Sequence, residues 1–429
     1  MFFKIINYLN SKKNFPYYIS TPIVYGIGGA SEHIAMVAAH AKRLSKKILI
    51  FKTRYFQKFL NYNVCNNALF DSLILNDQVN KKNFFYFLLD FLIQIEFTLR
   101  RVLAIFFKKF FRIDFGESFR FSFLGVTNLY TSNEINYNQI NPLGIKETKA
   151  DLENEKKKEF YKLLRSHGVK DKKFVCLHVR DNIYCKDAGR REYRNSNIKN
   201  YVELIKLLIG KNYYVFRLGD KPTPKLNFSS KQFIDYPYSN FKSELMDLFL
   251  IKECEFYVGT LSGPMDTAYL FNKPMLLTNM YDLFPSFPRK KNDRGIFKKM
   301  KNKKTGEIIN IKDFAKLNLN YHHYEIDIGD IVFEENSPEE LHDAMREYLD
   351  LINNKKNLNN VQIKFDDIQL KFNNFLHKRL KEIYEEELVK KNFFKNDNWK
   401  KCEFIKIIKR FKSCEGTFNS SYLQKNFNE

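Results

Sequence analysis

The sequence of 429 residues is poor in cysteine, and none of its six cysteines belongs to a C-x-x-C pair. They are too sparse for a disulfide framework, so we expect free thiols in a reducing compartment. The N-terminal stretch MFFKIINYLNSKKNF has neither a long apolar core nor a small-residue cleavage site, and it does not resemble a signal peptide. These features predict a cytoplasmic protein.

Several familiar motifs are also missing. The sequence has no G-x-S-x-G elbow, no P-loop, no zinc-finger spacing and no ribonucleoprotein signature. The acidic pair Glu325 and Asp327 lies in an ordinary-looking β segment, so we expect no metal site and no metal cofactor. The most hydrophobic stretch, 84–115, contains no uncharged run of the roughly 18 residues that a membrane-spanning helix needs.

Positive charge is what the sequence has in excess. The formal net charge is +23 at pH 7, from 72 Lys and Arg against 49 Asp and Glu. Such a charge attracts polyanions, which include nucleic acid, an anionic membrane face and phosphorylated substrates. Because the basic residues are spread along the chain and no nucleic-acid motif is present, we expect no nucleic-acid partner.

The length and the 44% content of hydrophobic residues predict two domains with a core each. A charged segment at 150–173 indicates the hinge between them. We therefore expect a first lobe at 1–160, a second lobe at 161–355, and C-terminal helices with a basic tail at 356–429.

Residues 21–51 have the pattern of a βαβ unit, which is typical of a parallel sheet. We expect a strand at 23–25, a turn at the glycines that follow, a helix with apolar residues at helical spacing, and a second strand at 48–51. The turn, GIGGASEHI, is not the G-x-G-x-x-G fingerprint of dinucleotide sites.

A second series of strands and helices alternates through the rest of the chain and predicts a doubly wound α/β sheet. We expect strands at 174–179, 213–218, 255–259 and 274–278, and helices at 198–208, 241–253 and 264–271. Ser337, Pro338 and Glu340 have the order of a capping box and predict a further helix start.

Polar side chains follow each of these four strands. In open parallel sheets ligands bind beyond the carboxyl ends of the strands, so we expect a donor site there. Arginine binds phosphate through a planar fork, and the run GTLSGPMD opens a helix whose free N–H groups attract an anion. Together they predict a diphosphate site. Its candidate residues are His178, Arg180, Asp181, Arg217, Gly219, Asp220, Asp235, Thr260, Ser262, Gly263 and Asn279.

Three of these residues have alternative interpretations. Arg180 could form a structural ion pair instead of binding phosphate, and His178 could be an ordinary buried histidine. Asp181 could be a catalytic base, a ribose ligand or a loop acid.

The glycine turn of the first lobe supplies a second set of candidates. Gly28 and Gly29 are expected to approach the donor, and Glu32 or His33 is expected to act as general base toward an acceptor hydroxyl. The alternative is a plain turn capped by Ser31.

The stretch 84–115 fits two interpretations, a pair of core helices or an amphipathic surface in a membrane interface. Arg100, Arg101, Lys108 and Lys109 lie beside Phe clusters and favour the membrane interface. The segment 385–412 is predicted to be helical, and it is either a solvated face or a second membrane-touching surface.

Several motifs in order resemble an uncharacterised family of bacterial glycosyltransferases from surface-polysaccharide gene clusters. They are CLHVRD, Arg194 with Asn195, Tyr201, VFRLGD, DYPYSNFKSELMDLFLIKECEFYVGTLSG and ENSPEEL. The resemblance covers roughly residues 20–50 and 165–350. The H-x-R strand end is more distantly similar to the fucosyltransferase group of the GT-B fold, which uses GDP-fucose without a metal.

The resemblance implies a GT-B fold of two Rossmann-like domains facing across a cleft, with the acceptor lobe first and the donor lobe second. Arg180 would grip the diphosphate of a nucleotide-sugar donor, with GDP as one candidate nucleotide, and Ser262 and Gly263 would touch its phosphate. The acceptor would be a surface glycan or lipid-linked glycan at the anionic inner membrane, where the enzyme would be peripherally bound. We expect inversion at the transferred sugar.

Two other functions are compatible with the same sequence. A sugar-nucleotide epimerase of the GT-B type would need no acceptor and no membrane surface. A non-catalytic polyanion-binding protein would keep the fold and the positive charge without the chemistry.

Overall fold

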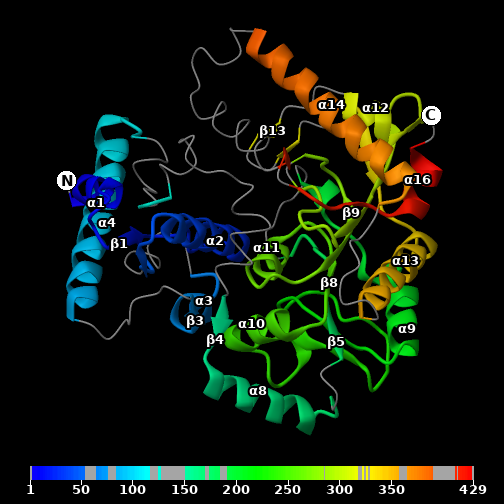
Figure 1. Cartoon of the computed structure of the whole chain (residues 1–429), viewed down its shortest axis with the longest axis horizontal. Coiled ribbons are helices and arrows are strands. Elements are labelled where there is room, and N and C mark those ends of the chain that lie inside the picture. The colour runs from blue at the N-terminus through cyan, green and yellow to red at the C-terminus, as the bar shows by residue number, and fades with distance from the viewer. Residues whose placement is uncertain are drawn as a thin grey trace. The chain divides into compact units, whose positions relative to one another are not determined.

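The computed structural model of the chain is drawn in Figure 1. It describes residues 2–53, 64–75, 84–115, 124–126, 150–169, 173–183, 191–284, 286–316, 321–322, 325–326, 329–356, 365–389, 411–412 and 414–427. The chain divides into two compact units. Unit 1 comprises Met1–Glu159, Ser243–Phe249 and Tyr269–Asn272, and unit 2 comprises Phe160–Lys242, Leu250–Ala268 and Lys273–Glu429.

Unit 1 contains the predicted βαβ unit, with a different first strand. Strand β1 (Tyr17–Ser20) pairs in parallel with β2 (Lys47–Ile50), and helix α2 (Ile27–Arg43) connects them. The strand predicted at 23–25 is therefore wrong. Pro22 has no N–H to donate to a strand ladder, so pairing cannot run through it and the chain leaves the sheet after Ser20.

A small core holds two helices of unit 1 together. Helix α1 (Phe2–Ser11) packs against α4 (Phe84–Phe111) beside β1 and β2, as Figure 1 shows. The main-chain N–H of Phe3 donates to Glu96 of α4 at 2.8 Å, and Lys46 Nζ donates to the carbonyl of Asn10 at 2.5 Å. Both ends of α1 are thus held by side chains, which satisfies backbone groups that a helix terminus leaves open.

The other described elements of unit 1 are short. Strand β3 (Leu73–Ile74) pairs antiparallel with β4 (Asp151–Leu152), and α3 (Asn67–Asp71) precedes them. Helix α8 (Asn154–Ser166) is longer, follows β4 and contains the boundary between the two units after Glu159. Within the described residues, the parallel sheet of this unit has two strands.

Unit 2 confirms the predicted doubly wound α/β sheet. Its seven strands are all parallel, in the order β16-β10-β9-β8-β5-β6-β7. They are β5 (Phe174–His178), β6 (Tyr214–Arg217), β7 (Phe233–Asp235), β8 (Tyr257–Gly259), β9 (Met275–Met280), β10 (Arg294–Phe297) and β16 (Thr417–Phe418). The central strands are almost wholly buried, as sheets covered on both faces require.

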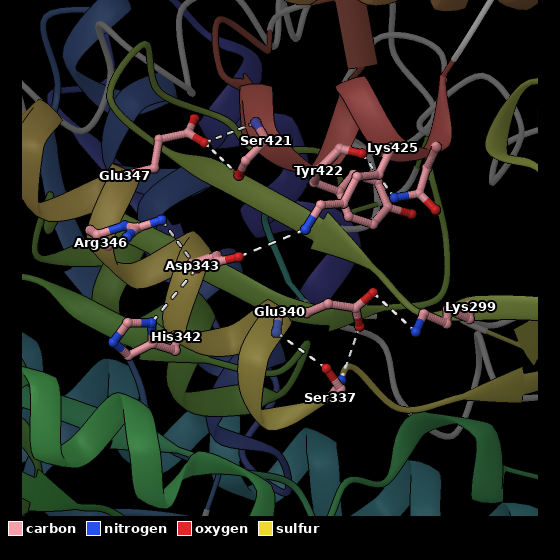
Figure 2. A network of polar contacts seen from close by, with 11 residues as sticks. Lys299, Ser337, Glu340, His342, Asp343, Arg346, Glu347, Ser421, Tyr422 and Lys425 are labelled. Carbon is pink, nitrogen blue, oxygen red and sulfur yellow. Dashed lines mark hydrogen bonds and ion pairs between the residues drawn. The ribbon is translucent and has the colours of Figure 1, made fainter.

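Helices connect the strands of this sheet along the chain. They are η3 (Glu192–Arg194), η4 (Ile198–Tyr201), α9 (Val202–Gly210), η5 (Tyr236–Tyr238), α10 (Glu244–Glu253), α11 (Gly263–Leu270), α12 (Ile311–Lys316), α13 (Pro338–Lys356) and α14 (Asp367–Val389). The predicted capping box is confirmed, since Ser337 N donates to Glu340 at 2.9 Å and Glu340 N donates to Ser337 Oγ at 3.2 Å (Figure 2).

A small antiparallel sheet follows β10, with β11 (Lys299–Asn302) between β12 (Ile308–Ile309) and β15 (Ile331–Glu334). A separate hairpin joins β13 (Tyr321–His322) to β14 (Glu325–Ile326). Asp327 of the predicted acidic pair lies outside the described residues.

The C-terminal segment contributes to the main sheet, which the sequence did not predict. Strand β16 extends the sheet beside β10, and helix α16 (Ser420–Asn426) follows it. Glu347 of α13 accepts hydrogen bonds from Ser420 N at 2.7 Å and from Ser421 N at 3.0 Å (Figure 2). A carboxylate at a helix N-terminus is favoured by the helix dipole, so this contact anchors α16 on α13.

Candidate functional site

The strand order of unit 2 reverses between β5 and β8. The chain runs outward from β5 to β6 and β7, and then returns to β8 on the other side of β5. Ligands of doubly wound sheets bind at such a switch point, beyond the carboxyl ends of the two strands. The loops that begin at Val179 and Thr260 lie there.

Two hydrogen bonds join these loops. The main-chain N–H of Arg180 donates to Thr260 Oγ1 at 2.9 Å, and the N–H of Thr260 donates to the carbonyl of His178 at 3.0 Å. The strand ends approach so closely that a Cβ on Gly259 would lie 2.2 Å from that carbonyl oxygen. Only glycine fits between them, so the geometry of the switch point is fixed by the backbone.

His178 and Ser262 lie together across the switch point. His178 Nδ1 and Ser262 Oγ are 2.9 Å apart. Burial lowers the pKa of His178 to about 4, against the opposing effect of the carboxylates of Asp181 and Asp220. The imidazole is therefore neutral at pH 7 and orients the serine hydroxyl that precedes α11.

Arg180 is 7% exposed, and its side chain is held by a further hydrogen bond. Its Nη1 donates to Oδ1 of Asn195, and the main-chain carbonyl of Asn195 accepts a hydrogen bond of 2.6 Å from Lys298 Nζ.

Asp181 is engaged elsewhere, because its carboxylate accepts from the hydroxyl of Thr223 and from Ile183 N at 3.0 Å. These contacts give Asp181 the role of ordering the loop after β5.

Arg217 and Asp235 are directed at each other. They are register partners on β6 and β7, and their side chains form an ion pair at 3.1 Å. Arg217 also donates to the carbonyl of Pro224 at 2.7 Å and to Thr223 Oγ1 at 2.9 Å, and it is 2% exposed. These contacts hold the Arg217 guanidinium at the sheet edge, and donor binding by Arg217 and Asp235 stays a prediction.

Gly219 and Asp220 follow β6 directly. Gly219 has a φ of 149°, and Asp220 forms an ion pair with Lys242 at 3.0 Å. The Asp220 side chain is 58% exposed, so it remains accessible to a ligand.

Asn279 is fully buried, and its main-chain N–H and both polar atoms of its side chain are hydrogen-bonded. Its N–H donates to Asn336 Oδ1 and its Oδ1 accepts from Asn336 N, both at 2.7 Å. Its amide donates to the hydroxyl of Tyr201 at 2.9 Å, and that hydroxyl also contacts Thr278 Oγ1 at 2.7 Å. The side chain of Asn279 ties β9 to the segment before α13, and donor binding by Asn279 stays a prediction.

Lys298 was missed by the sequence analysis. It follows β10, a strand of four residues that the sequence pattern did not indicate, and it is 2% exposed. Burial lowers the pKa of Lys298 to about 8, Glu335 opposes this shift and Arg180 adds to it. The one available signal was its position directly after a short apolar run between charged residues.

Asp282, close after the end of β9, is another buried group with a shifted pKa, besides Lys298. Burial raises the pKa of Asp282 to about 6, although Arg194 and Arg289 favour its charged form. The guanidinium of Arg194 lies over the ring of Tyr281 at 5.6 Å, and Arg289 forms an ion pair with Asp266 at 3.0 Å. The carboxyl edge of the sheet thus carries both acids and cations, and Arg289 is paired with one of the acids.

The candidates of the first lobe lie inside a helix and not in a turn. Gly26 is the N-cap of α2, and Gly28 and Gly29 occupy its first turn. A Cβ on Gly29 would come within 2.9 Å of Ile23, so this glycine allows close packing. His33 is buried, and its Nδ1 accepts a hydrogen bond of 3.1 Å from Ile23 N. Glu32, half-buried, is the remaining acid of this set.

The stretch 84–115 forms one helix, α4, and not a pair. Arg101 is buried, Arg100 forms an ion pair with Glu96 at 2.8 Å and Lys108 forms one with Asp114 at 2.9 Å, so three of its four predicted surface cations are engaged with protein. The rest of its surface is unusually apolar. The large hydrophobic residues of α4 that are at least 39% exposed are Phe84, Phe85, Phe87, Leu88, Phe91, Ile95, Leu99, Val102, Leu103, Ile105, Phe106, Phe110 and Phe111.

No helix in the described parts of the chain is long and apolar enough to cross a membrane. Likewise, within those parts no three His, Cys, Asp or Glu side chains gather as a metal site would require. Most of the predicted helix at 385–412 lies outside the described residues.

Comparison with known proteins gives no family. No family model matches the sequence, and no curated protein matches it. Among solved structures, the chain is similar to the Escherichia coli ADP-heptose LPS heptosyltransferase II, with 12% sequence identity, 79% of this chain and 99% of that chain covered, and a TM-score of 0.40. This likeness is too slight to assign an activity, so function has to be argued from the site.

Proposed function

We propose that the chain is a glycosyltransferase of the GT-B type that moves a sugar from a nucleotide-diphosphate donor, GDP being one candidate, to a hydroxyl of a surface glycan or lipid-linked acceptor. Residues 1–160 would form the acceptor lobe and residues 161–355 the donor lobe. One observation carries the proposal. Arg180 and the His178–Ser262 pair meet at the switch point of a doubly wound sheet, beside the N-terminus of α11.

The chemistry needs a place for the charge of the leaving diphosphate. A fixed guanidinium and the free N–H groups at the start of α11 would stabilise that charge more in the transition state than in the bound donor. Arg180 is pre-positioned by its bonds to Thr260 and Asn195, so little reorganisation is needed. A protein cation can thus take the part that a divalent metal plays elsewhere, and we propose a metal-independent reaction.

A direct displacement with inversion also needs a base for the acceptor hydroxyl. Glu32 is our candidate. His33 is a poor one because its Nδ1 already accepts from Ile23, which leaves the proton on Nε2.

We further propose that α4 holds the enzyme against the anionic inner membrane from the cytoplasmic side. Its exposed Phe and Leu side chains would enter the headgroup region, as in helices that lie in a membrane interface. Lys108 and Lys109 near its end and the net charge of +23 would attract anionic lipid.

The proposal is tested by analysing products from a panel of nucleotide sugars, with and without membrane-extracted glycan acceptor. Transfer that depends on acceptor is expected, and Arg180→Ala should abolish it. Arg346→Ala is a matched control, because Arg346 is exposed on α13 and pairs with Asp343 at 3.2 Å. Epimerised donor without acceptor would indicate the epimerase. Anion binding that falls steeply with salt, without turnover, would indicate a polyanion-binding protein.

A further inference from the structure

Lys298 is a buried cation without an ion pair in the described part of the chain. Its ammonium makes one hydrogen bond, to the main-chain carbonyl of Asn195 at 2.6 Å. A buried charge is costly unless an opposite charge and hydrogen bonds compensate it. An ammonium has three donors, and a neutral carbonyl satisfies only one of them.

The acid that opposes the lowering of the Lys298 pKa already accepts hydrogen bonds from other groups. Glu335 accepts from Asn197 N at 2.7 Å and from Asn200 Nδ2 at 3.1 Å, and it makes no ion pair with Lys298. The other charged group acting on Lys298 is Arg180, which repels it. The protein therefore places two cations close together, and among the described residues one of them has no ion pair.

Asn195 fixes the relation between these two cations. Its side-chain oxygen accepts from Arg180 and its main-chain oxygen accepts from Lys298. Because β10 and β5 are parallel strands of one sheet, Lys298 after β10 and Arg180 after β5 lie at the same carboxyl edge. A ligand with two adjacent negative groups would satisfy both.

We propose that Lys298 is a second phosphate-binding residue of the donor site and acts together with Arg180 on the diphosphate. The inference rests on the proposed function and adds a residue to it. The alternative is a structural lysine that only supports the loop at Asn195, in which case its removal would leave anion binding unchanged.

Inorganic pyrophosphate is the probe, and isothermal titration calorimetry at pH 7 gives its affinity for the full chain. Removing a charge-assisted hydrogen bond from a buried site lowers the affinity by roughly tenfold to a hundredfold. We expect such a loss for Lys298→Met and for Arg180→Ala. Lys299→Met is the matched control, since this neighbour is 43% exposed and pairs with Glu340 on the surface, and its affinity should stay within about twofold.

The pH dependence of the wild-type protein tests the same residue without a neutral variant. Burial, together with Arg180, lowers the pKa of Lys298 to about 8 against the pull of Glu335. Pyrophosphate gains negative charge as pH rises, so its own titration would strengthen binding. We expect instead about tenfold weaker binding at pH 9 than at pH 7, and Lys298→Arg should remove this loss because arginine keeps its charge.

The outcomes separate the two claims. If Arg180→Ala loses pyrophosphate while Lys298→Met and the pH profile do not change it, the role of Lys298 is overturned and the donor site stands. If the wild-type protein binds neither pyrophosphate nor any nucleoside diphosphate, both claims are overturned.

Discussion

The main-chain N–H of Arg180 and Oγ1 of Thr260 are joined by a hydrogen bond of 2.9 Å between the ends of β5 and β8. This bond fixes the backbone of Arg180 where the strand order reverses. An arginine that binds phosphate bidentately needs a fixed backbone position, because its side chain has several rotatable bonds. The threonine hydroxyl thereby contributes to the site by holding the backbone of Arg180.

Thr260→Val should therefore weaken both folding and ligand binding. The valine keeps the shape but leaves a buried N–H unsatisfied, which lowers the free energy of unfolding by about 1–3 kcal/mol. Pyrophosphate affinity should also fall. Urea unfolding and calorimetry measure the two effects. Thr417→Val, at the edge strand β16, removes a buried bond to Asn373 at 2.9 Å and should affect stability alone. Equal pyrophosphate affinity in both variants would contradict this role.

His178 makes a prediction about acid sensitivity. Burial lowers its pKa from 6.5 to about 4, so the unfolded chain binds this proton more readily than the folded protein does. The contribution of His178 to stability is present above pH 6.5 and is lost as pH falls toward 4. Urea unfolding at pH 7 and pH 5 should show a shallower decline in His178→Gln than in the wild type. Identical slopes would mean that His178 is not buried as a neutral side chain.

Lys298 predicts the opposite kind of effect in the ligand-free protein. Its pKa is lowered from 10.5 to about 8, so at pH 7 the folded protein carries a buried charge that has no ion pair among the described residues. Lys298→Met should be more stable than the wild type at pH 7, by on the order of 1–3 kcal/mol. The difference should shrink between pH 8 and 10.5, where the folded protein releases this proton before the unfolded chain does. A variant that is less stable at pH 7 would show that the lysine is compensated.

The exposed face of α4 predicts binding to anionic vesicles. Phe84, Phe87 and Phe110 are 78%, 69% and 65% exposed, so replacing all three by serine should not disturb the core. Flotation with phosphatidylserine vesicles should fall strongly for this variant, and also for Lys108→Glu with Lys109→Glu. Leu370→Ser, on α14 and 48% exposed, is a control for exposed apolar surface elsewhere. Unchanged flotation of the phenylalanine variant would remove α4 from the membrane proposal.

Much of unit 2 could be predicted because its strands are short buried runs, each followed by polar residues. The same rule predicted Arg180, Thr260 and Ser262 at one edge of the sheet, and the structure brings them together. The rule did not predict the ion pair of Arg217, because its partner is set by strand register. Nothing local in the sequence indicates that Asp235 lies opposite it on β7.

Two features depended on contacts between distant segments. Strand β16 has two residues and pairs with β10, more than 100 residues earlier, so no periodicity could indicate it. Without β10 there was no reason to single out Lys298. In unit 1, the glycines suggested a turn, but Gly26 caps a helix that already includes Gly28 and Gly29. Close packing on Ile23 is a structural reason for Gly29 that the sequence did not indicate.

The most direct test of the account is a thermal-shift screen of the full chain with GDP, UDP, CMP, dTDP and their common sugar conjugates. A ligand that binds only the folded protein raises the melting temperature by mass action. We predict a clear rise with one nucleotide family, absent in Arg180→Ala and retained in Arg346→Ala. No rise with any of these compounds, or an equal rise in Arg180→Ala, would contradict a nucleotide-diphosphate site at this switch point.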